Sequence, residues 1–184
     1  TYGNFIITST DSVVPLSASF VGADNDNASV VTTEMINDTV MGGENTVLPR
    51  LSTVIDMNHT KGDGLFLRNT IIKIDPDCGI INAGRRGIQA RERSTISAIG
   101  SNFSGANWNG IKAQHACIIA LSSADMSNCC NNPGGYTGPD QPASAAYFSK
   151  GCFVACRLLD VSGSGTNGLE VRRSFVDAEA INAS

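Results

Sequence analysis

Two acidic residues near the C-terminal end are spaced for acid–base chemistry. Asp177 and Glu179 are two residues apart in a segment that alternates like a strand, which places them on one face roughly 6.5–7 Å apart. Glycosidases use carboxylate pairs separated by about 5–5.5 Å or about 6.5–9.5 Å. Asp177 and Glu179 are therefore candidate catalytic residues for polysaccharide cleavage. The alternative is an ordinary salt bridge, because the repeat described below stacks Glu179 over Arg157.

Aromatic residues suggest a second kind of chemistry, the binding of sugars. Trp108, the only tryptophan, lies in a turn rich in Asn and Gly, one repeat before a long loop that carries Tyr136. Exposed aromatic rings beside Asn and Asp side chains hold sugars by stacking and hydrogen bonding. Trp108 and Tyr136 are therefore candidate glycan-binding residues. A tryptophan that folds back to cap its own turn is the alternative.

A polar column with several cations recurs at one outward position of the repeat. It reads Arg68, Arg91, Gln114, Lys150 and Arg172. Such a stripe is suited to an acidic polysaccharide or a partner surface, which makes Arg91 and Gln114 further candidates for glycan binding. The alternative is a solvated sheet face on which neighbouring Glu92 and Glu170 pair with the cations.

Six cysteines require an explanation before any compartment is assigned. They are Cys78, Cys117, Cys129, Cys130, Cys152 and Cys156. The spacing is not that of a zinc site and the chain has two histidines, so no metal is expected. The even number allows three disulfides, but Cys117, Cys152 and Cys156 fall in inward columns of the repeat. We interpret these three as buried free thiols, whereas adjacent Cys129 and Cys130 lie in a predicted loop and are less certain.

A repeat of about 22–23 residues organises the second two-thirds of the chain. Similar segments begin at Gly64, Gly87, Gly110, Ala146 and Gly168. The interval from Gly110 to Ala146 equals one period plus an insertion. An inward apolar column reads Ile72, Ile96, Ile119, Val154 and Val176. A polar column at a bend reads Asn102, Asp125, Asp160 and Asn182, with Asp56 at the same place further upstream.

Strand-like alternation nested inside a fixed longer period predicts short strands stacked coil upon coil, roughly 4.8 Å apart. We therefore expect an all-β fold: a parallel β-helix, or solenoid, over residues 56–184, with a loop insertion at about 128–144. Residues 1–55 are less regular and are predicted to form early coils or a small capping module. A leucine-rich horseshoe is disfavoured, because the chain contains only nine leucines without a repeated Leu pattern.

Composition excludes several other classes of protein. The chain has 184 residues and is rich in Gly, Ser and Asn, which disfavours a helical bundle. Only 16% of residues are charged, and the net charge of −4 gives no reason to expect a nucleic-acid partner. The apolar runs are too short for insertion into a membrane. Because the chain opens at Thr1 without an initiator Met or signal peptide, we expect a fragment of a longer protein.

The stacked coils, the Asn/Asp ladder, the Ser/Cys/Thr and Ile/Val columns and the single protruding loop resemble the right-handed parallel β-helices. That group includes pectate-lyase-like enzymes and the tailspike and tail-fibre proteins of bacteriophages, and the resemblance covers about residues 50–184. Free buried cysteines and a Gly/Ser/Asn-rich fragment without a secretion signal favour the phage proteins. The calcium-binding aspartates and Arg base of pectate lyases are not discernible here.

The resemblance implies a right-handed coil and three hypotheses for function. The first is a fragment of a phage receptor-binding tailspike, folded in the host cytoplasm and carried on the virion tail, that binds host surface polysaccharide as a homotrimer. The second is a polysaccharide-degrading enzyme, either a glycoside hydrolase or a lyase. The third is a structural shaft without a ligand. None of the three calls for a cofactor.

Overall fold

The computed structural model describes residues 20–21, 41–44, 51, 54–59, 63–131 and 144–184. These residues form strands and turns without a helix, arranged as a parallel β-solenoid of about 5 turns. Every pair of neighbouring strands is parallel, because each coil contributes one strand to each of the sheets that it enters. The all-β parallel solenoid predicted from the sequence is thus confirmed.

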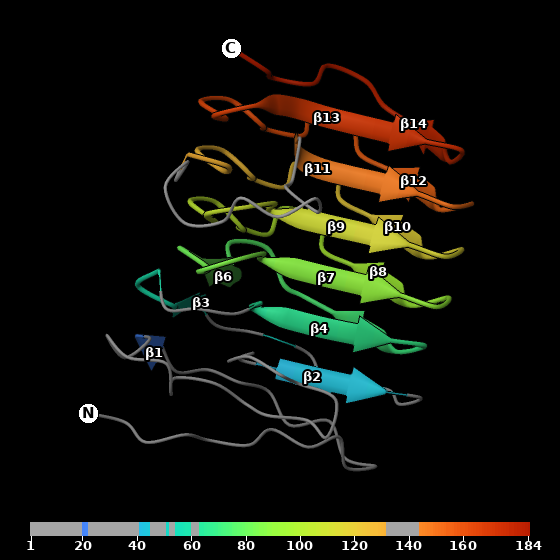
Figure 1. Cartoon of the computed structure of the whole chain (residues 1–184), viewed down its shortest axis with the longest axis horizontal. Helices are drawn as coiled ribbons and strands as arrows, with labels where there is room; N and C mark the ends of the chain where they lie inside the picture. The colour runs from blue at the N-terminus through green and yellow to red at the C-terminus, as the bar shows by residue number, and fades with distance from the viewer. Residues whose placement is uncertain (1–19, 22–40, 45–50, 52–53, 60–62, 132–143) are drawn as a thin grey trace.

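Three sheets run along the stack (Figure 1). The six-stranded sheet consists of β2 (Met41–Glu44), β4 (Leu65–Arg68), β7 (Ile88–Arg91), β9 (Ile111–Gln114), β11 (Ser144–Ser149) and β13 (Asn167–Arg172). The five-stranded sheet consists of β5 (Ile71–Lys73), β8 (Thr95–Ser97), β10 (Ile118–Ala120), β12 (Phe153–Ala155) and β14 (Phe175–Asp177). The three-stranded sheet consists of β1 (Phe20–Val21), β3 (Val54–Asp56) and β6 (Gly79–Ile81).

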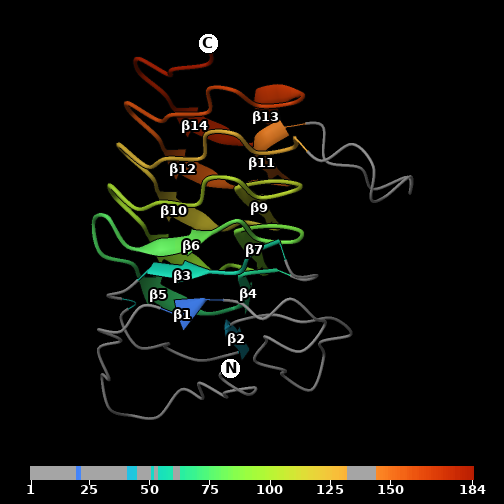
Figure 2. The same ribbon diagram turned by 90° about the vertical axis from the view of Figure 1, so that its left-hand side faces the viewer.

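The coil is right-handed. In Figure 1 the six-stranded sheet lies in front with its strands pointing to the right, and the chain turns there into the five-stranded sheet behind it. Figure 2, seen from the left, places the six-stranded sheet on the right, the five-stranded sheet on the left and the three-stranded sheet nearest the viewer. Because the C-terminal coils lie at the top of both views, the chain rises as it circles in the right-handed sense.

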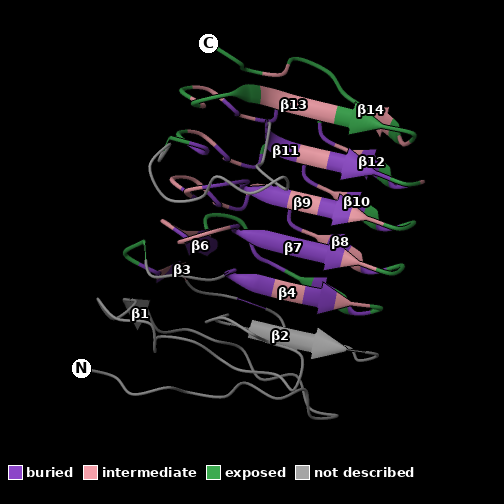
Figure 3. Ribbon diagram, in the orientation of Figure 1, coloured by how far each residue is buried: buried purple, intermediate pink, exposed green. Residues whose placement is uncertain are grey.

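The predicted inward column is confirmed by the strand register. Ile119 lies between Ile96 on the preceding coil and Val154 on the following one. Residues 65 and 88, and then 88 and 111, pair across a separation of 23 residues, whereas Phe153 and Phe175 pair across 22. These inward side chains form one continuous apolar core (Figure 3). The coil length of about 22–23 residues is therefore correct.

The polar column at the bend is also present, and it shapes the turn of each coil. Isolated bridges connect Asn102, Asp125, Asp160 and Asn182 from one coil to the next. Each side-chain Oδ1 accepts a hydrogen bond from the backbone N–H two residues later, at N···O distances of 2.8–3.4 Å. Short Asn and Asp side chains favour this local turn, so the ladder repeats wherever the chain must bend.

Two details of the predicted register are wrong. Ala146 pairs with Ile111, so Ala145 and not Ala146 is the equivalent of Gly110. The same one-residue shift places Ser149, in place of Lys150, opposite Gln114. The preceding insertion removes the constant spacing, and two adjacent small residues, Ala145 and Ala146, each satisfy a position that requires a small side chain.

The second error concerns the start of the polar column. Asp56 pairs with Ile81, whereas Val54 pairs with Gly79, the residue that bridges to Asn102. Asp56 nevertheless makes the same local turn, because its Oδ1 accepts the N–H of Asn58 at 2.8 Å. Asp56 therefore forms the same local turn, but it lies two residues after the position that belongs to the polar column.

Candidate functional site

The edge at which the six-stranded sheet turns into the five-stranded sheet carries exposed apolar side chains in a column. This apolar ladder consists of the first residue of each strand in the five-stranded sheet: Ile71, Thr95, Ile118, Phe153 and Phe175. Ile118, Phe153 and Phe175 are 56%, 54% and 71% exposed. The rings of Phe153 and Phe175 stack with centroids 5.3 Å apart and planes 7° from parallel. Large apolar residues gathered in this way typically mark a contact surface.

A groove runs beside the apolar ladder on the outer face of the five-stranded sheet. Its volume is about 760 Å³, and it extends over β8, β10, β12 and β14. The hollow arises because the second outward column has small side chains at Ser97, Ala120 and Ala155, next to the bulky Ile118 and Phe153. The groove therefore exists because one outward column of the five-stranded sheet has bulky side chains and the next outward column has small ones.

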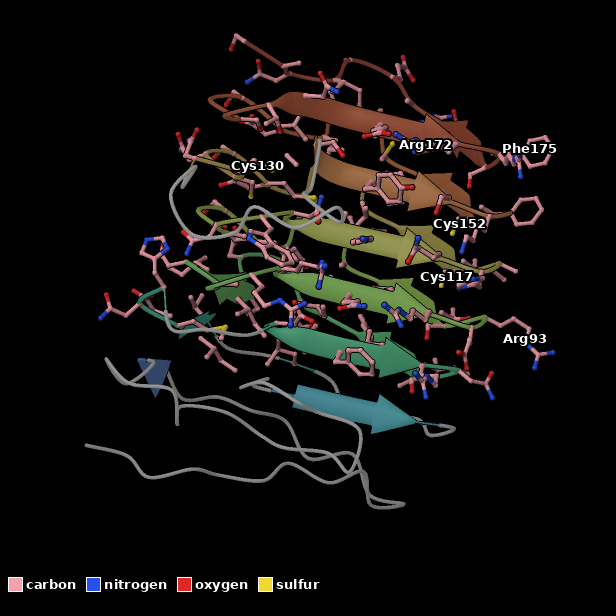
Figure 4. The ribbon with its side chains drawn as sticks, in the orientation of Figure 1. Arg93, Cys117, Cys130, Cys152, Arg172 and Phe175 are labelled. Carbon is pink, nitrogen blue, oxygen red and sulfur yellow. The ribbon has the colours of Figure 1, made fainter. Side chains whose placement is uncertain are left out.

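Cations gather on the other side of the apolar ladder, at the ends of the strands of the six-stranded sheet. This basic ridge comprises Arg68, Arg91, Glu92, Arg93, His115, Lys150, Arg172 and Arg173. With Glu170 counted, it contains six of the chain's 13 Lys and Arg residues and two carboxylates, a net charge of +4 with neutral histidine, in a chain of net charge −4. Figure 4 shows Arg93 and Phe175 projecting from the same edge of the solenoid.

Backbone geometry at this turn directs the ridge side chains outward. Glu92, His115, Lys150 and Arg173 all have positive φ, between 52° and 64°. Residues other than Gly rarely adopt this conformation, but stacking supplies compensating hydrogen bonds. The Ala116 N–H donates to the Lys150 carbonyl at 3.0 Å and the Arg93 N–H donates to the His115 carbonyl at 2.9 Å. Successive ridge residues are thereby held one above another.

Only part of the positive charge on the ridge is neutralised. Arg68 pairs with Glu92 at 3.4 Å, and Arg172 pairs with Glu170. In residues 63–131 and 144–184, no carboxylate lies within ion-pair distance of Arg91, Arg93 or Lys150. The unpaired cations make the ridge attractive to anions.

Lys150 contacts a histidine instead of a carboxylate. Its Nζ lies 3.2 Å from Nε2 of His115. Partial desolvation lowers the pKa of His115 below its ordinary value, and the positive charges of Lys150 and Arg91 lower it further. Glu92 acts in the opposite direction. His115 is thus a proton acceptor placed among cations.

Arg91 and Gln114, two of the predicted glycan-binding residues, lie at the border of the ridge. Arg91 is half-buried directly above Arg68, and its Nε is buried without a hydrogen-bond partner. Gln114 donates from Nε2 to Oγ of Ser149 at 3.2 Å. The structure therefore places both residues beside the unpaired cations.

Asp177 and Glu179 lie near the other side of the groove, where Arg157 binds them. Arg157 Nη2 lies 3.0 Å from Oδ2 of Asp177, and its Nε lies 3.7 Å from Oε2 of Glu179. The predicted salt bridge between Glu179 and Arg157 is confirmed. Asp177 is also part of the groove lining, so its participation in catalysis stays a prediction.

Trp108 lies elsewhere, at the opposite ends of the strands in the six-stranded sheet. Its side chain is only 9% exposed, and the guanidinium groups of Arg85 and Arg86 each lie 4.7 Å from its ring. Arg86 is buried and donates to Oδ1 of Asp63 at 3.2 Å and to Oε1 of Gln89 at 2.8 Å. The covered ring does not offer a sugar an open face, in agreement with the alternative of a structural cap. Tyr136 lies outside the described residues.

The cysteines occupy structural positions. All six are free, and Cys117 and Cys152 lie in one column on successive coils (Figure 4). Each thiol donates to a carbonyl three residues earlier at 3.2 Å, as the Ser94 hydroxyl does at 2.7 Å. Burial raises the pKa of Cys156 to about 11. The interpretation of Cys117, Cys152 and Cys156 as buried free thiols is confirmed.

The apolar ladder was not predicted from the sequence, although the sequence contains a signal for it. Each member directly precedes a member of the inward column, so Ile118 precedes Ile119 and Phe153 precedes Val154. An apolar residue at a position that alternation assigns to solvent indicates either a hidden contact or an exposed binding surface. The repetition of this exception on four coils, at Ile71, Ile118, Phe153 and Phe175, is that signal.

Comparisons with protein-family models, curated proteins and solved structures return no match for this chain. Among the described residues, no helix has the length and apolar character needed to cross a bilayer. In the same residues, no three His, Cys, Asp or Glu side chains are grouped to hold a metal ion. The class of protein is accordingly defined by its architecture, the parallel β-solenoid.

Proposed function

We propose that this β-solenoid binds a polysaccharide chain in the groove beside the apolar ladder. The observation that carries the proposal is the stacked pair of exposed rings, Phe153 and Phe175, at the rim of an open groove. The apolar faces of sugars pack on aromatic side chains, and their hydroxyl groups require polar partners nearby. Thr95, Ser97 and Asp177 in the groove lining supply such partners.

The shape of the groove favours a chain over a compact ligand. The groove crosses four strands, from β8 to β14, and parallel strands are spaced by roughly 4.8 Å, which gives a length of roughly 14 Å. It is open along this length, and each coil that it crosses contributes one strand to the lining, with Thr95 and Ser97 at one end and Phe175 and Asp177 at the other. An open groove built across successive coils suits an extended polymer.

The sequence resemblance supplies the biological setting of the proposal: a fragment of a bacteriophage tailspike or tail fibre that binds host surface polysaccharide. The homotrimer, the virion tail and folding in the host cytoplasm belong to the same proposal. What supports this setting is the solenoid fold together with the buried free thiols. Sedimentation equilibrium measures the mass in solution; a mass three times that of one chain is expected, and a monomer would contradict the trimer.

Cleavage of the polysaccharide is a second candidate function, because Asp177 lines the groove and Glu179 follows it two residues beyond the end of β14, where Arg157 contacts both carboxylates. Incubation of the protein with capsular polysaccharide or lipopolysaccharide tests it. Release of oligosaccharides that is abolished by Asp177→Asn would establish an enzyme. Binding without release would leave a receptor-binding module.

The binding proposal is tested by titrating a panel of bacterial capsular polysaccharides and lipopolysaccharides against the protein. Phe153→Ser and Phe175→Ser should each weaken binding about tenfold or more, the scale of a lost aromatic anchor. Ile99→Ser is the matched control, because Ile99 is 49% exposed but lies outside the groove. Affinity that is unchanged in both Phe variants would remove the groove from consideration. If the Phe variants change the mass of the protein in solution and leave its affinity for polysaccharide unchanged, the apolar ladder is a contact between copies of the chain.

A further inference from the structure

We infer that the bound polymer is acidic and that one of its anionic groups sits against Arg91, His115 and Lys150. This inference rests on the proposed function, since it assigns the chemistry of the same ligand. It adds a site that the groove alone does not define. The anionic group is a carboxylate or a phosphate, both of which accept hydrogen bonds from guanidinium, imidazolium and ammonium groups.

The three side chains come from successive coils at the same turn. Arg91 ends β7, His115 directly follows β9 and Lys150 directly follows β11. The hydrogen bond from the Ala116 N–H to the Lys150 carbonyl places His115 and Lys150 in neighbouring positions of the stack. The apolar ladder begins only three residues after each of the two, at Ile118 and Phe153. A polymer lying along the ladder therefore passes this cluster.

Within residues 63–131 and 144–184, no carboxylate forms an ion pair with Arg91 or Lys150. The Nζ of Lys150 lies 3.2 Å from a histidine nitrogen, and Arg91 has a buried Nε without a hydrogen-bond acceptor. Within the described ranges, the acidic residue facing His115 is Glu92, which is paired with Arg68. Cations held together without a counter-charge repel one another, and a bound anion removes that repulsion.

An acidic polysaccharide fits the surroundings better than a nucleic acid. The Phe153 and Phe175 rings already stack on each other at 5.3 Å, so a base does not fit between them. The whole chain has a net charge of −4, and Asp177 and Glu179 are acidic and lie near the far side of the groove. Long-range attraction for a densely charged polyanion is therefore weak, and a polymer with spaced charges is favoured.

Binding of the anion is coupled to protonation of His115. The charged groups that face this ring are Arg91 and Glu92 on the preceding coil and Lys150 on the following coil. In the free protein the neighbouring cations oppose protonation, whereas a bound anion favours it. Binding therefore takes up a proton, and affinity rises as the pH falls below the ordinary range of histidine, about 6.5.

The test compares two forms of one polymer, sodium polygalacturonate and its methyl-esterified form, which lacks the charges. The acidic form should bind more tightly, and its advantage should shrink as salt is added. The double variant Arg91→Gln with Lys150→Gln should lose about five- to twentyfold in affinity for polygalacturonate, because exposed charge contacts contribute about two- to fivefold each. Its affinity for the methyl-esterified polymer should not change. Arg157→Gln is the matched control: it removes one positive charge near the other side of the groove, where carboxylates already neutralise it.

Proton coupling gives an independent measurement. Affinity for polygalacturonate should rise about two- to fivefold between about pH 7.5 and about pH 5.5, where the polymer stays ionised. His115→Gln should abolish this rise, and Lys150→Gln alone should weaken binding at both values of pH. Lys150 is exposed, so this single variant provides the test if the double variant does not fold.

The outcomes separate this inference from the proposed function. Equal binding of the acidic and esterified polymers, or equal losses in Arg157→Gln and the double variant, overturns the acidic site and leaves the groove intact. Loss of binding in the Phe variants without any loss in the Arg91→Gln and Lys150→Gln variants also overturns the acidic site and leaves the groove intact. Binding of neither polymer at low salt also overturns the inference, while neutral chains of the panel still test the groove. Tighter binding of single-stranded oligothymidylate than of polygalacturonate would assign the ridge to nucleic acid.

Discussion

The two ends of the six-stranded sheet both carry arginine side chains, but the arginines differ in whether a carboxylate neutralises them. At the end where the strands begin, Arg85 and Arg86 pack against Trp108, and Asp63 neutralises Arg86 in a buried contact. At the end where the strands finish, Arg91 and Lys150 lie among other cations without a carboxylate partner in the described residues. Nε of Arg85, Arg86 and Arg91 is in each case buried without a hydrogen-bond partner, so the two ends differ in the counter-charge. Asp63 supplies it within the protein at the first end, and we propose that a ligand supplies it at the second.

This difference shows why arginine beside an aromatic ring is not by itself a binding site. A buried guanidinium needs a counter-charge in the protein, because an unpaired charge in the interior is costly. An exposed guanidinium has water as its partner, so it remains available to an incoming anion. Neutralisation and burial, more than residue type, separate the packed cluster around Trp108 from the ridge.

The largest effect is expected from Asp63→Asn at the packed end. It leaves the buried charge of Arg86 without its carboxylate, which should lower the free energy of unfolding by about 3–5 kcal/mol. Denaturant-induced unfolding measures this loss. Glu92→Gln is the control on the ridge, where the ion pair with Arg68 is partly exposed and its removal should cost less than about 1 kcal/mol. Equal losses in the two variants would contradict the distinction between the two ends.

Trp108→Ala should have the next largest effect, a loss of about 2–4 kcal/mol. The ring is 9% exposed and covers two guanidinium groups, so its truncation leaves a cavity and removes two cation–π contacts. Thermal unfolding and polysaccharide titration should be measured on the same variant. A stable variant with weakened binding would show that Trp108 belongs to the ligand site after all.

The double variant Arg91→Gln with Lys150→Gln should leave stability within about 0.5 kcal/mol of the parent or raise it slightly. Removing cations that repel one another relieves their repulsion, which offsets the loss of the exposed contact between Lys150 and His115. Denaturant unfolding without ligand gives the value. A clear destabilisation would mean that these cations stabilise the folded chain, as the arginines around Trp108 do.

The smallest effect concerns the pH dependence of stability. The pKa of His115 is lowered in the folded chain, so the unfolded chain binds the proton more readily. Stability from this group is therefore complete above the ordinary pKa of about 6.5 and decreases as the pH falls through it. The melting temperature should drop slightly more in the parent than in His115→Gln on going to about pH 5.5. An identical pH profile in the two proteins would exclude His115 as a source of the change.

The fold was predictable because its signal is local and repeated. Ile119 lies between Ile96 and Val154 in both the sequence columns and the structure, since strand alternation and coil length together determine which side chains face inward. The register predicted from the sequence is wrong by one residue after the insertion. The constant spacing is interrupted there, and the adjacent residues Ala145 and Ala146 are identical. The candidate site was only partly predictable: Arg91 and Gln114 were named for their column, but the exposed rings of Phe153 and Phe175 were not.

The solenoid, its coil length and the inward columns follow from the sequence alone, because each depends on periodic residue size and polarity along one chain. Which arginines are neutralised depends instead on contacts between coils. Asp63 lies 23 residues before Arg86 and reaches it one coil away, whereas Lys150 meets His115 across 35 residues. Such pairings depend on side-chain directions and on distances between coils, and these quantities separate the packed cluster around Trp108 from the exposed cations of the ridge.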